Sequence, residues 1–254
     1  MKDIRISRLF TAKSHILTNQ YLHSLCYDRG MLSIVPTPIG NLRDITIRAK
    51  ETLTSCDAII CEDTRVTGQL LKLLELPKKE FISFHGYTDD GKADYIVERL
   101  QKGEHLCLVS DAGTPGISDP GYVVVSRVRA AGLQIEALPG PSAFLVALSA
   151  SGLAINQFLY LGFLPLKKGR QTLLQTFKTE ERTIVFYESP HRIQKTLSEL
   201  ATVLEDQPER TLVIARELTK MHEQIIHAKI ATLHEVIKTM TVKGEFVVVI
   251  EGTR

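Results

Sequence analysis

The chain contains 254 residues, of which 44% are hydrophobic and 24% are charged, and its formal net charge is +2. This composition is typical of a soluble globular protein and excludes the disordered, collagen-like and coiled-coil classes. A net charge of this size does not by itself indicate nucleic-acid binding. Charged residues interrupt every apolar run well before the roughly 20 positions that span a bilayer, so the sequence does not predict a membrane protein.

The first thirty residues carry more basic than acidic side chains but lack the apolar core and the cleavage site of a secretory signal. Two interpretations stay open for residues 1–30: an amphipathic organellar presequence, or a disordered or non-native extension ahead of a working start at Met31. We favour the extension. Four cysteines are present without any CxxC pair, a usage that argues against disulfides and structural zinc and is typical of a cytoplasmic protein.

From Met31 onwards, short β-rich runs alternate with segments of helical periodicity. Strands are expected at 32–36, 58–61, 81–84 and 106–109. Helices are expected from an N-cap at Asp44 to Ser55, from Thr64 to just before Pro77, from Asp94 to Lys102, and from Asp119-Pro120 to Gly132. The repeated order of strand, loop and helix predicts a mostly parallel sheet covered by helices.

A break in this alternation at Pro139-Gly140-Pro141 predicts an α/β domain at 31–141 and a second domain at 142–254. The second part opens on a helix from Ala143 to Ala150, and its strands are expected at 157–163, 183–187, 212–216 and 246–250. Fewer helices separate these strands. The best marked helix places four apolar residues on one face, Ile193, Leu197, Leu200 and Leu204. We therefore predict an α+β domain with a mixed sheet.

Two loops rich in proline and glycine follow strands of the first domain, from Pro36 to Asp44 and from Ser110 to Gly121. Their glycines let a ligand approach the backbone closely, and their prolines stiffen the turns. In an open α/β sheet, such loops lie beyond the carboxyl ends of the strands, where ligands bind. The second loop matches neither a Walker A motif nor GxGxxG, which removes the usual support for ATP or NAD. The alternative for it is a long turn with a helix cap at Asp119.

Charged side chains gather at three further strand ends. Cys61 to Arg65 holds two carboxylates and a guanidinium, which serve either in binding or as a helix cap with an ion pair. Tyr187 to Arg192 and Ala215 to Lys220 are the other two. The densest basic cluster, Lys167 to Arg170, is expected to be a solvated loop. No group of His, Cys, Asp and Glu has metal-ligand spacing, so no metal site is predicted.

Six segments stand out in this order and spacing: VPTPIGNLRDIT (35–46), CEDTR (61–65), SDAGTPGISDPG (110–121), LPGPSA (138–143), FYESPHR (186–192) and ARELTK (215–220). Together they resemble the ribosomal small-subunit RNA cytidine-2′-O-methyltransferases, a family in the tetrapyrrole-methylase-like class (class III) of S-adenosylmethionine-dependent methyltransferases. The resemblance implies two α/β domains with the cofactor folded in the cleft between them, usually in a homodimer. It also implies methyl transfer to the ribose 2′-hydroxyl of a cytidine in the decoding region of 16S ribosomal RNA, either free or in the 30S subunit.

The resemblance further implies that the proline- and glycine-rich loops and the inter-domain hinge hold S-adenosyl-L-methionine. The residues implied for cofactor binding are Pro36, Thr37, Pro38, Gly40, Asp111, Ala112, Gly113, Thr114, Pro115, Ser118, Asp119, Gly121, Pro141, Ser142 and Ala143. The tetrapyrrole-type alternative, methylation of a small molecule on the same scaffold, calls for an open apolar trough, and a chain with no Trp and 6% aromatic residues disfavours it. A second alternative is an RNA-binding module without catalysis.

A ribose hydroxyl is a very weak acid, so a general base or a nearby cation is expected to add about two to four orders of magnitude in rate. The candidates are charged residues at loop ends that face the expected cleft, namely Glu62, Asp63, Arg65, Glu188, His191, Arg216, Glu217 and Lys220. Among them we assign Asp63 and Glu188 as base or orienting carboxylate. Arg65 and Lys220 are assigned to stabilise a phosphate or the developing alkoxide.

Overall fold

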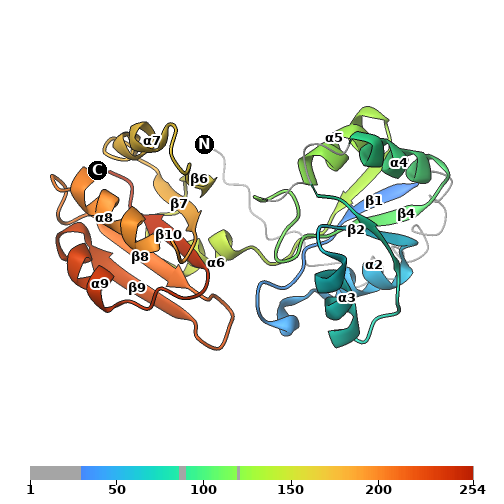
Figure 1. Ribbon diagram of the computed structural model, residues 1–254, viewed down its shortest axis with the longest axis horizontal. Helices are drawn as coiled ribbons and strands as arrows, with labels where there is room; N and C mark the ends of the chain where they lie inside the picture. Colours follow the sequence, from blue (N-terminus) through green and yellow to red (C-terminus); the bar gives the residue numbers. More distant parts are fainter. Residues whose placement is uncertain (1–29, 86–89, 119–120, 254) are drawn as a thin grey trace, which may run out of the picture.

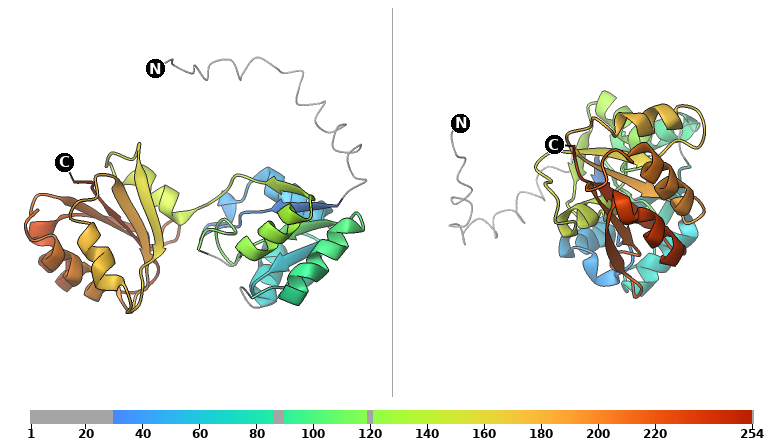
Figure 2. Two further views of the ribbon diagram at one scale, coloured as in Figure 1. Left: turned by 90° about the horizontal axis from the view of Figure 1, so that it is seen from above. Right: turned by 90° about the vertical axis from the view of Figure 1, so that its left-hand side faces the viewer.

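The computed structural model describes residues 30–85, 90–118 and 121–253, which form two lobes side by side (Figure 1). Each lobe contains one five-stranded sheet with helices packed on it. The stretch between β5 (Gln134–Ala137) and α6 (Ala143–Ala150) leads from one lobe to the other, as Figure 2 shows. The predicted domain boundary at residue 141 falls in this connection and stays a prediction.

The sheet of the first lobe is entirely parallel, in the strand order β3-β2-β4-β1-β5. Its other strands are β1 (Met31–Ile34), β2 (Ala58–Cys61), β3 (Glu80–Ser83) and β4 (His105–Leu108). One face carries α2 (Ile47–Ser55) and α3 (Thr64–Leu73), and the other carries α4 (Asp90–Gln101) and α5 (Gly121–Ala130). Because successive strand side chains point to opposite faces, Ile59 and Ile60 enter different hydrophobic clusters. The predicted parallel sheet is confirmed.

Two helix starts of the first lobe differ from the prediction. Asp44 lies in a short 3-10 turn, η2 (Leu42–Asp44), and Thr46 caps α2 instead, by accepting a hydrogen bond from a backbone N–H of the first turn at 3.0 Å. α4 begins at Asp90, four residues before the predicted Asp94. α3 begins at Thr64 as predicted, with Asp63 as its cap. For α2 and α3 the capping residue is the one whose backbone is still extended immediately before the first helical turn.

The sheet of the second lobe is mixed, in the strand order β6-β7-β10-β8-β9, with β6 parallel to β7 and the other pairs antiparallel. Its strands are β6 (Phe158–Phe163), β7 (Thr183–Glu188), β8 (Thr211–Arg216), β9 (Gln224–Lys229) and β10 (Phe246–Ile250). The remaining elements are α7 (Arg170–Thr176), α8 (Ile193–Val203), η3 (Ile230–Thr232) and α9 (Leu233–Thr239). The predicted mixed sheet is confirmed.

The two faces of the second sheet have different surroundings. On one face, α7, α8 and α9 bury the largest hydrophobic cluster, and the four predicted apolar positions of α8 and its end are all fully buried. On the other face, α6 covers Val185, Val213 and Val249, and Ile117 of the first lobe packs against the same cluster. This second face is therefore the one that meets the first lobe. Within the described ranges, no helix has the length and apolar character needed to cross a membrane.

Candidate active site

The two proline- and glycine-rich loops of the first lobe meet in space. Thr37 and Gly113 form an isolated antiparallel bridge, with the Thr37 N–H donating to the Gly113 carbonyl at 2.9 Å and the Gly113 N–H donating to the Thr37 carbonyl at 3.1 Å. The Thr37 hydroxyl also donates to the Ser110 carbonyl at 3.0 Å, and this side chain is buried. Gly113 has a φ of 89°, which few residues with a side chain adopt. The sequence pattern predicted neighbouring loops, and the structure joins them directly.

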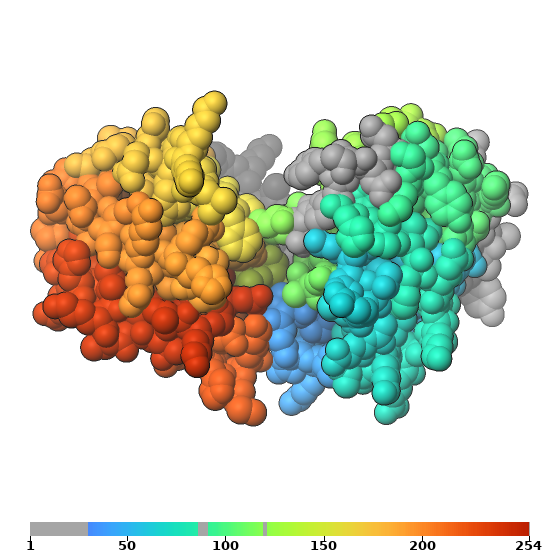
Figure 3. Space-filling view, viewed as in Figure 1, coloured from blue at the N-terminus to red at the C-terminus, as the bar shows by residue number. Residues whose placement is uncertain are grey.

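A cavity of about 490 Å³ lies in front of this bridge, between the lobes. Loop residues of the first lobe line one side, and the ends of β6, β7 and β10 line the other. The lining residues are Ile39, Glu62, Asp111, Ala112, Gly113, Thr114, Ile117, Ser118, Ser142, Ala143, Phe163, Tyr187, Glu188, Ser189, Pro190, Leu218, Glu245, Phe246 and Val247. The space-filling view in Figure 3 shows the two lobes in contact beside this region, where blue atoms of the first loop abut the second lobe.

Seven of the residues expected to bind a cofactor line this cavity, namely Asp111, Ala112, Gly113, Thr114, Ser118, Ser142 and Ala143. From the first loop, Ile39 faces the cavity, whereas Pro36, Thr37, Pro38 and Gly40 are not among its lining residues. Pro115 and Gly121 line a small space behind the second loop, and Pro141 lies behind Ser142. Asp119 lies outside the described residues. The second loop therefore forms the wall, while the first supports it from behind.

The hinge between the lobes is fastened to both loops. The Thr114 hydroxyl donates to the Pro141 carbonyl at 2.9 Å. Gly140 lies so close to the Pro36 ring that any side chain at position 140 would collide with it. The Ser142 hydroxyl lines the cavity, is buried, and makes no hydrogen bond of normal geometry. Since a buried hydroxyl without a partner is costly, Ser142 offers a polar contact to a ligand.

The Cys61–Arg65 segment borders the cavity beside the second loop. The Asp63 N–H donates to the Asp111 carboxylate at 3.2 Å, which ties the two segments together. Hydrogen bonds from the Arg65 side chain and backbone hold the pKa of Asp63 well below its ordinary value. A carboxylate with so low a pKa is a poor proton acceptor. Of the three charged residues in this segment, Glu62 is the one that lines the cavity.

Glu188 lies at the end of β7 and is 1% exposed. Its carboxylate accepts hydrogen bonds from the Thr196 hydroxyl at 2.7 Å and from the Ser189 N–H at 2.8 Å, and it pairs with Arg192 at 2.8 Å. These contacts occupy both carboxylate oxygens. They favour a structural role for Glu188, which holds the turn between β7 and α8 beside the cavity. They do not favour the proton transfer that was expected from the sequence.

The Ala215–Lys220 segment forms a strained turn at the edge of the site. Glu217 and Thr219 have φ values of 51° and 65°, in the left-handed region that residues with side chains rarely adopt. The Lys220 ammonium group donates to the carboxylates of Glu217 at 2.9 Å and Glu245 at 2.8 Å. The Lys220 stem packs against Gly40, so this turn contacts the first loop across the gap between the lobes.

Sequence reasoning missed the aromatic and apolar wall that the second lobe contributes, chiefly Phe163, Tyr187 and Leu218. The Tyr187 ring lies 5.7 Å from Tyr160 and 5.5 Å from Phe163, and its hydroxyl accepts a hydrogen bond from the Phe144 N–H at 3.3 Å. Burial, with the neighbouring Tyr160, raises the pKa of Tyr187 above its ordinary value. Tyr187 begins the FYESPHR segment's turn, and that motif was the one available signal for it.

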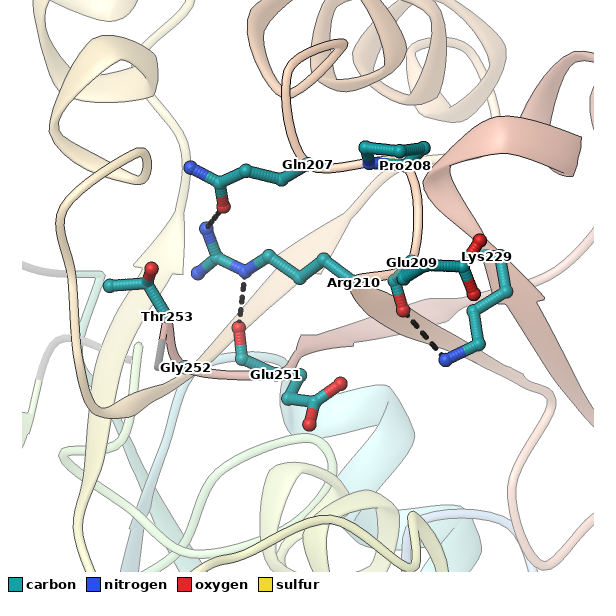
Figure 4. Close-up of a pocket in the computed structure, with 8 residues that line it drawn as sticks. All are labelled: Gln207, Pro208, Glu209, Arg210, Lys229, Glu251, Gly252 and Thr253. Carbon is teal, nitrogen blue, oxygen red and sulfur yellow. Dashed lines mark hydrogen bonds between the residues drawn. The ribbon is translucent and has the colours of Figure 1, made fainter.

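A second cavity of about 370 Å³ lies at the opposite end of the second lobe (Figure 4). At its centre, the buried Arg210 guanidinium donates to the carbonyls of Phe177 and Glu251 and to the side-chain oxygen of Gln207. One guanidinium nitrogen, Nη2, makes no hydrogen bond. The six segments singled out from the sequence contribute nothing to this cavity. Within the described ranges, no group of His, Cys, Asp and Glu is arranged to hold a metal ion.

Fold and site together define a two-lobed α/β protein with a nucleoside-sized cavity where the loops of a parallel sheet face a mixed sheet. The family model of the tetrapyrrole (corrin/porphyrin) methylases matches residues 31–234. A solved structure of uroporphyrin-III C-methyltransferase from Thermus thermophilus, complexed with S-adenosyl homocysteine, is similar in fold, with a TM-score of 0.59 and 18% identity over 87% of this chain and 97% of that one.

Curated relatives are much closer in sequence. "Ribosomal RNA small subunit methyltransferase I" of Synechocystis is 46% identical over 88% of this chain and 79% of its own length. The protein of the same name from Escherichia coli O157:H7 is 46% identical over 88% of this chain and 78% of its own. The chain thus belongs to the tetrapyrrole methylase family and, within it, to the group of these small-subunit ribosomal RNA methyltransferases.

Proposed function

We propose that the cavity between the lobes binds S-adenosyl-L-methionine and that the protein transfers its methyl group to ribosomal RNA. The observation that carries this proposal is the bridge between Thr37 and Gly113, because it turns two stiff loops into one wall of a cavity. A volume of about 490 Å³ is within the range of about 300–1,000 Å³ for small-molecule sites. The complex of the Thermus thermophilus relative with S-adenosyl homocysteine supports the same ligand class.

The lining residues suit a nucleoside cofactor. Ile39, Ile117 and Leu218 offer apolar contacts, and the absence of a side chain at Gly113 leaves room for a ligand against the loop. Asp111 and the unpartnered Ser142 hydroxyl offer polar contacts. When bound, S-adenosylmethionine supplies an activated methyl group. The chain's own task is to orient the acceptor oxygen, exclude water and manage one proton.

For the proton, we propose Glu62 as the acceptor, because it lines the cavity directly beside Asp111 and the second loop. Asp63 then acts as a positioning residue, through its cap on α3 and its link to Asp111. Arg65, with a side chain 89% exposed, is placed to meet a phosphate of an incoming RNA. Lys220 does not line the cavity, and the carboxylates of Glu217 and Glu245 hold its ammonium group, so we assign it to maintaining the strained turn and not to stabilising an alkoxide.

For the substrate, we propose the ribose 2′-hydroxyl of a cytidine in the decoding region of 16S ribosomal RNA, free or in the 30S subunit. The names of the relatives support a small-subunit ribosomal RNA, and the sequence resemblance supports the cytidine and the 2′-oxygen. A cytoplasmic homodimer is part of the same proposal. The runner-up substrate is a tetrapyrrole, in keeping with the cobalt precorrin-4 methyltransferase and the uroporphyrin-III C-methyltransferase that share this fold.

The test is transfer of a tritiated methyl group from S-adenosylmethionine to purified 30S subunits, followed by mass mapping of ribose methylation. The proposal predicts label at one cytidine 2′-oxygen. RNA binding without label transfer would favour a non-catalytic module, and label on a tetrapyrrole alone would favour the small-molecule enzyme. In single-turnover assays, Glu62→Gln is expected to slow transfer about 100-fold or more, whereas cofactor binding is retained. A wild-type rate in this variant would remove Glu62 from the mechanism.

A further inference from the structure

Strand β6 contains an irregularity where it reaches the cavity. It pairs in regular parallel register with β7 from Phe158 to Tyr160, but the next pair is Phe163 with Tyr187, so β6 carries one extra residue there. Gly162, inside this bulge, has a φ of 60°. Bulges bend a strand and redirect the side chain that follows, and they are frequent next to active sites. Here the redirected side chain is Phe163, and it lines the cavity.

The Phe163 ring is unusually exposed for a large apolar side chain. Its residue exposure is 54%, and its ring centroid lies 5.5 Å from that of Tyr187, at an interplanar angle of 53°. Further inward, the Tyr187 ring contacts Tyr160, with ring centroids 5.7 Å apart, and Tyr160 contacts Phe144, with ring centroids 4.4 Å apart. The row of rings is thus packed at its inner end and open at Phe163. An exposed aromatic ring at the edge of a reaction cavity is a surface on which a flat ligand can stack.

A contact with the second loop of the first lobe fixes the position of the Phe163 ring. The Ser118 and Tyr160 hydroxyls are hydrogen-bonded at 2.6 Å, which links the second loop of the first lobe to the bulge. A side chain at Gly162 would reach within 3.1 Å of the Ser118 hydroxyl oxygen, so both its φ and the available space favour glycine there. The loop that faces the cofactor cavity therefore also holds the strand that presents Phe163.

Positive charge follows the aromatic ring directly. Arg192 donates to the Leu164 carbonyl and Arg170 donates to the Pro165 carbonyl, each at 3.1 Å, so the segment after β6 is held in place. Lys167 and Lys168, at the end of this segment, are exposed. In Figure 3 the yellow segment that follows β6 stands at the upper edge of the second lobe, toward the first lobe. Aromatic rings combined with positive charge are the usual composition of a surface that binds single-stranded nucleic acid.

We infer that Phe163 is a stacking platform for the base of an unpaired pyrimidine nucleotide in RNA, and that Lys167 and Lys168 bind the adjacent phosphates. This inference rests on the proposed function and deepens it, because stacking the base would bring its own ribose to the cavity. An unpaired nucleotide lacks the stacking contacts of a helix, and an aromatic surface replaces those contacts. The occupant is therefore the target nucleotide itself.

The test compares Phe163→Ala and Phe163→Tyr with Phe158→Ala, a matched control on the same strand that is 39% exposed and does not line the cavity. Stacking on an aromatic side chain accounts for about a 5- to 150-fold difference in affinity. Phe163→Ala is expected to raise KM for the 30S subunit by that factor and to leave the melting temperature unchanged. Phe163→Tyr, which keeps the ring, should stay within about twofold of wild type, and so should the Phe158 variant.

A double variant, Lys167→Gln with Lys168→Gln, tests the phosphate contacts. It should reduce the slope of the logarithm of RNA affinity against the logarithm of salt concentration by about 1.4 in magnitude, because each contact with single-stranded RNA contributes about 0.7. If wild type methylates the subunit and Phe163→Ala does so with unchanged KM, the stacking inference is wrong and the proposed function stands. If wild type transfers no methyl group to RNA, both are wrong. A Phe163→Ala variant that loses self-association with unchanged KM would show instead that the ring contacts a second copy of the chain.

Discussion

The cavity around Arg210 and the cavity between the lobes differ in how their polar groups are held. At the far end of the second lobe, Arg210 is 7% exposed (Figure 4). Its guanidinium donates three hydrogen bonds, to two backbone carbonyls and to a side-chain amide oxygen of its own lobe. Between the lobes, the Ser142 hydroxyl makes no hydrogen bond and lines the cavity. Size alone therefore does not distinguish a binding site from a structural junction.

The difference also lies in which parts of the chain meet. The Arg210 cavity is built from one lobe, at the junction of the α8–β8 turn and the end of β10. The cavity between the lobes combines the Thr37–Gly113 bridge with the strained turn at Glu217 and Thr219. Backbone strain costs stability, and it persists where function requires it. We expect substitutions in the first region to affect folding and those in the second to affect binding.

The largest effect is expected from Arg210→Ala. Its removal takes away the hydrogen bonds that it donates to the Phe177 and Glu251 carbonyls, which costs about 3 kcal/mol of unfolding free energy and lowers the melting temperature by about 6 to 12 °C. Calorimetric melting measures this, and cofactor affinity below the transition should equal that of wild type. The exposed Arg129→Ala serves as control, with a change within about 0.5 kcal/mol. If Arg210→Ala keeps the melting temperature of wild type but binds the cofactor more weakly, the structural role assigned to the Arg210 cavity is wrong.

Gly140→Ala, beside the cavity between the lobes, is expected to weaken cofactor binding. The added methyl group collides with the Pro36 ring, so the first loop must shift away from the hinge. Overpacking of this kind costs about 1–3 kcal/mol, and we expect cofactor affinity to fall about tenfold or more. Equilibrium dialysis with tritiated S-adenosylmethionine measures it. Gly91→Ala is the control, since nothing lies within 4 Å of the added atom. Equal affinity in the two variants would mean that the Pro36 loop has no part in binding.

A smaller effect is expected from Thr37→Val. This substitution keeps the shape of the side chain but removes its hydrogen bond to the Ser110 carbonyl behind the bridge. The loss of about 1 kcal/mol should weaken cofactor binding about fivefold. Thr183→Val is a matched control, because the Thr183 hydroxyl is buried and donates to the Ala154 carbonyl away from the cavity. The control should lose stability but not cofactor affinity, and weakened binding in both variants would argue against a specific role for the bridge.

The smallest effect is a pH dependence of stability from the strained turn. Burial alone would raise the pKa of Glu217, but hydrogen bonds from Lys220 and from the Glu245 N–H outweigh it and leave the pKa below its ordinary value. The ionised carboxylate thus stabilises the fold above its ordinary pKa, and this contribution is lost as the pH falls through the lowered value. Denaturant unfolding should show Glu217→Gln less stable than wild type by under about 1 kcal/mol at neutral pH.

The difference between wild type and Glu217→Gln should then narrow as the pH is lowered toward about 3. Glu235→Gln, on the exposed side of α9, should show no such trend. If the difference in unfolding free energy between wild type and Glu217→Gln increases as the pH falls, the Glu217 carboxylate is not ionised and paired as assigned.

The strands of both lobes could largely be predicted from the sequence because they are apolar and buried, as β2 and β10 are throughout. Two edge strands could not. β5 and β9 mix polar with apolar residues and are partly exposed, so neither forms an apolar run. The loops of the site were predictable for a local reason, since glycine and proline specify backbone geometry. Prediction stopped at which loop residues face the ligand, because the Thr37–Gly113 bridge turns most of the first loop away from the cavity.

The aromatic wall could not be predicted for a different reason. Phe163 faces the cavity through a one-residue bulge that depends on pairing with β7 and on Ser118 of the other lobe. Such a contact depends on tertiary assembly and leaves no local pattern. The same holds for Glu188, where the sequence showed a carboxylate at a strand end but not the buried contacts that occupy it.

The most direct test of the account is the location of S-adenosyl homocysteine in a crystal of the complex. The account predicts one molecule per chain between the lobes, against the backbone of Asp111–Thr114 and within reach of the Ser142 hydroxyl. It also predicts that the cavity around Arg210 contains none of it. Density for the ligand at Arg210, or its absence from the space in front of the Thr37–Gly113 bridge under saturating conditions, would contradict the central claim.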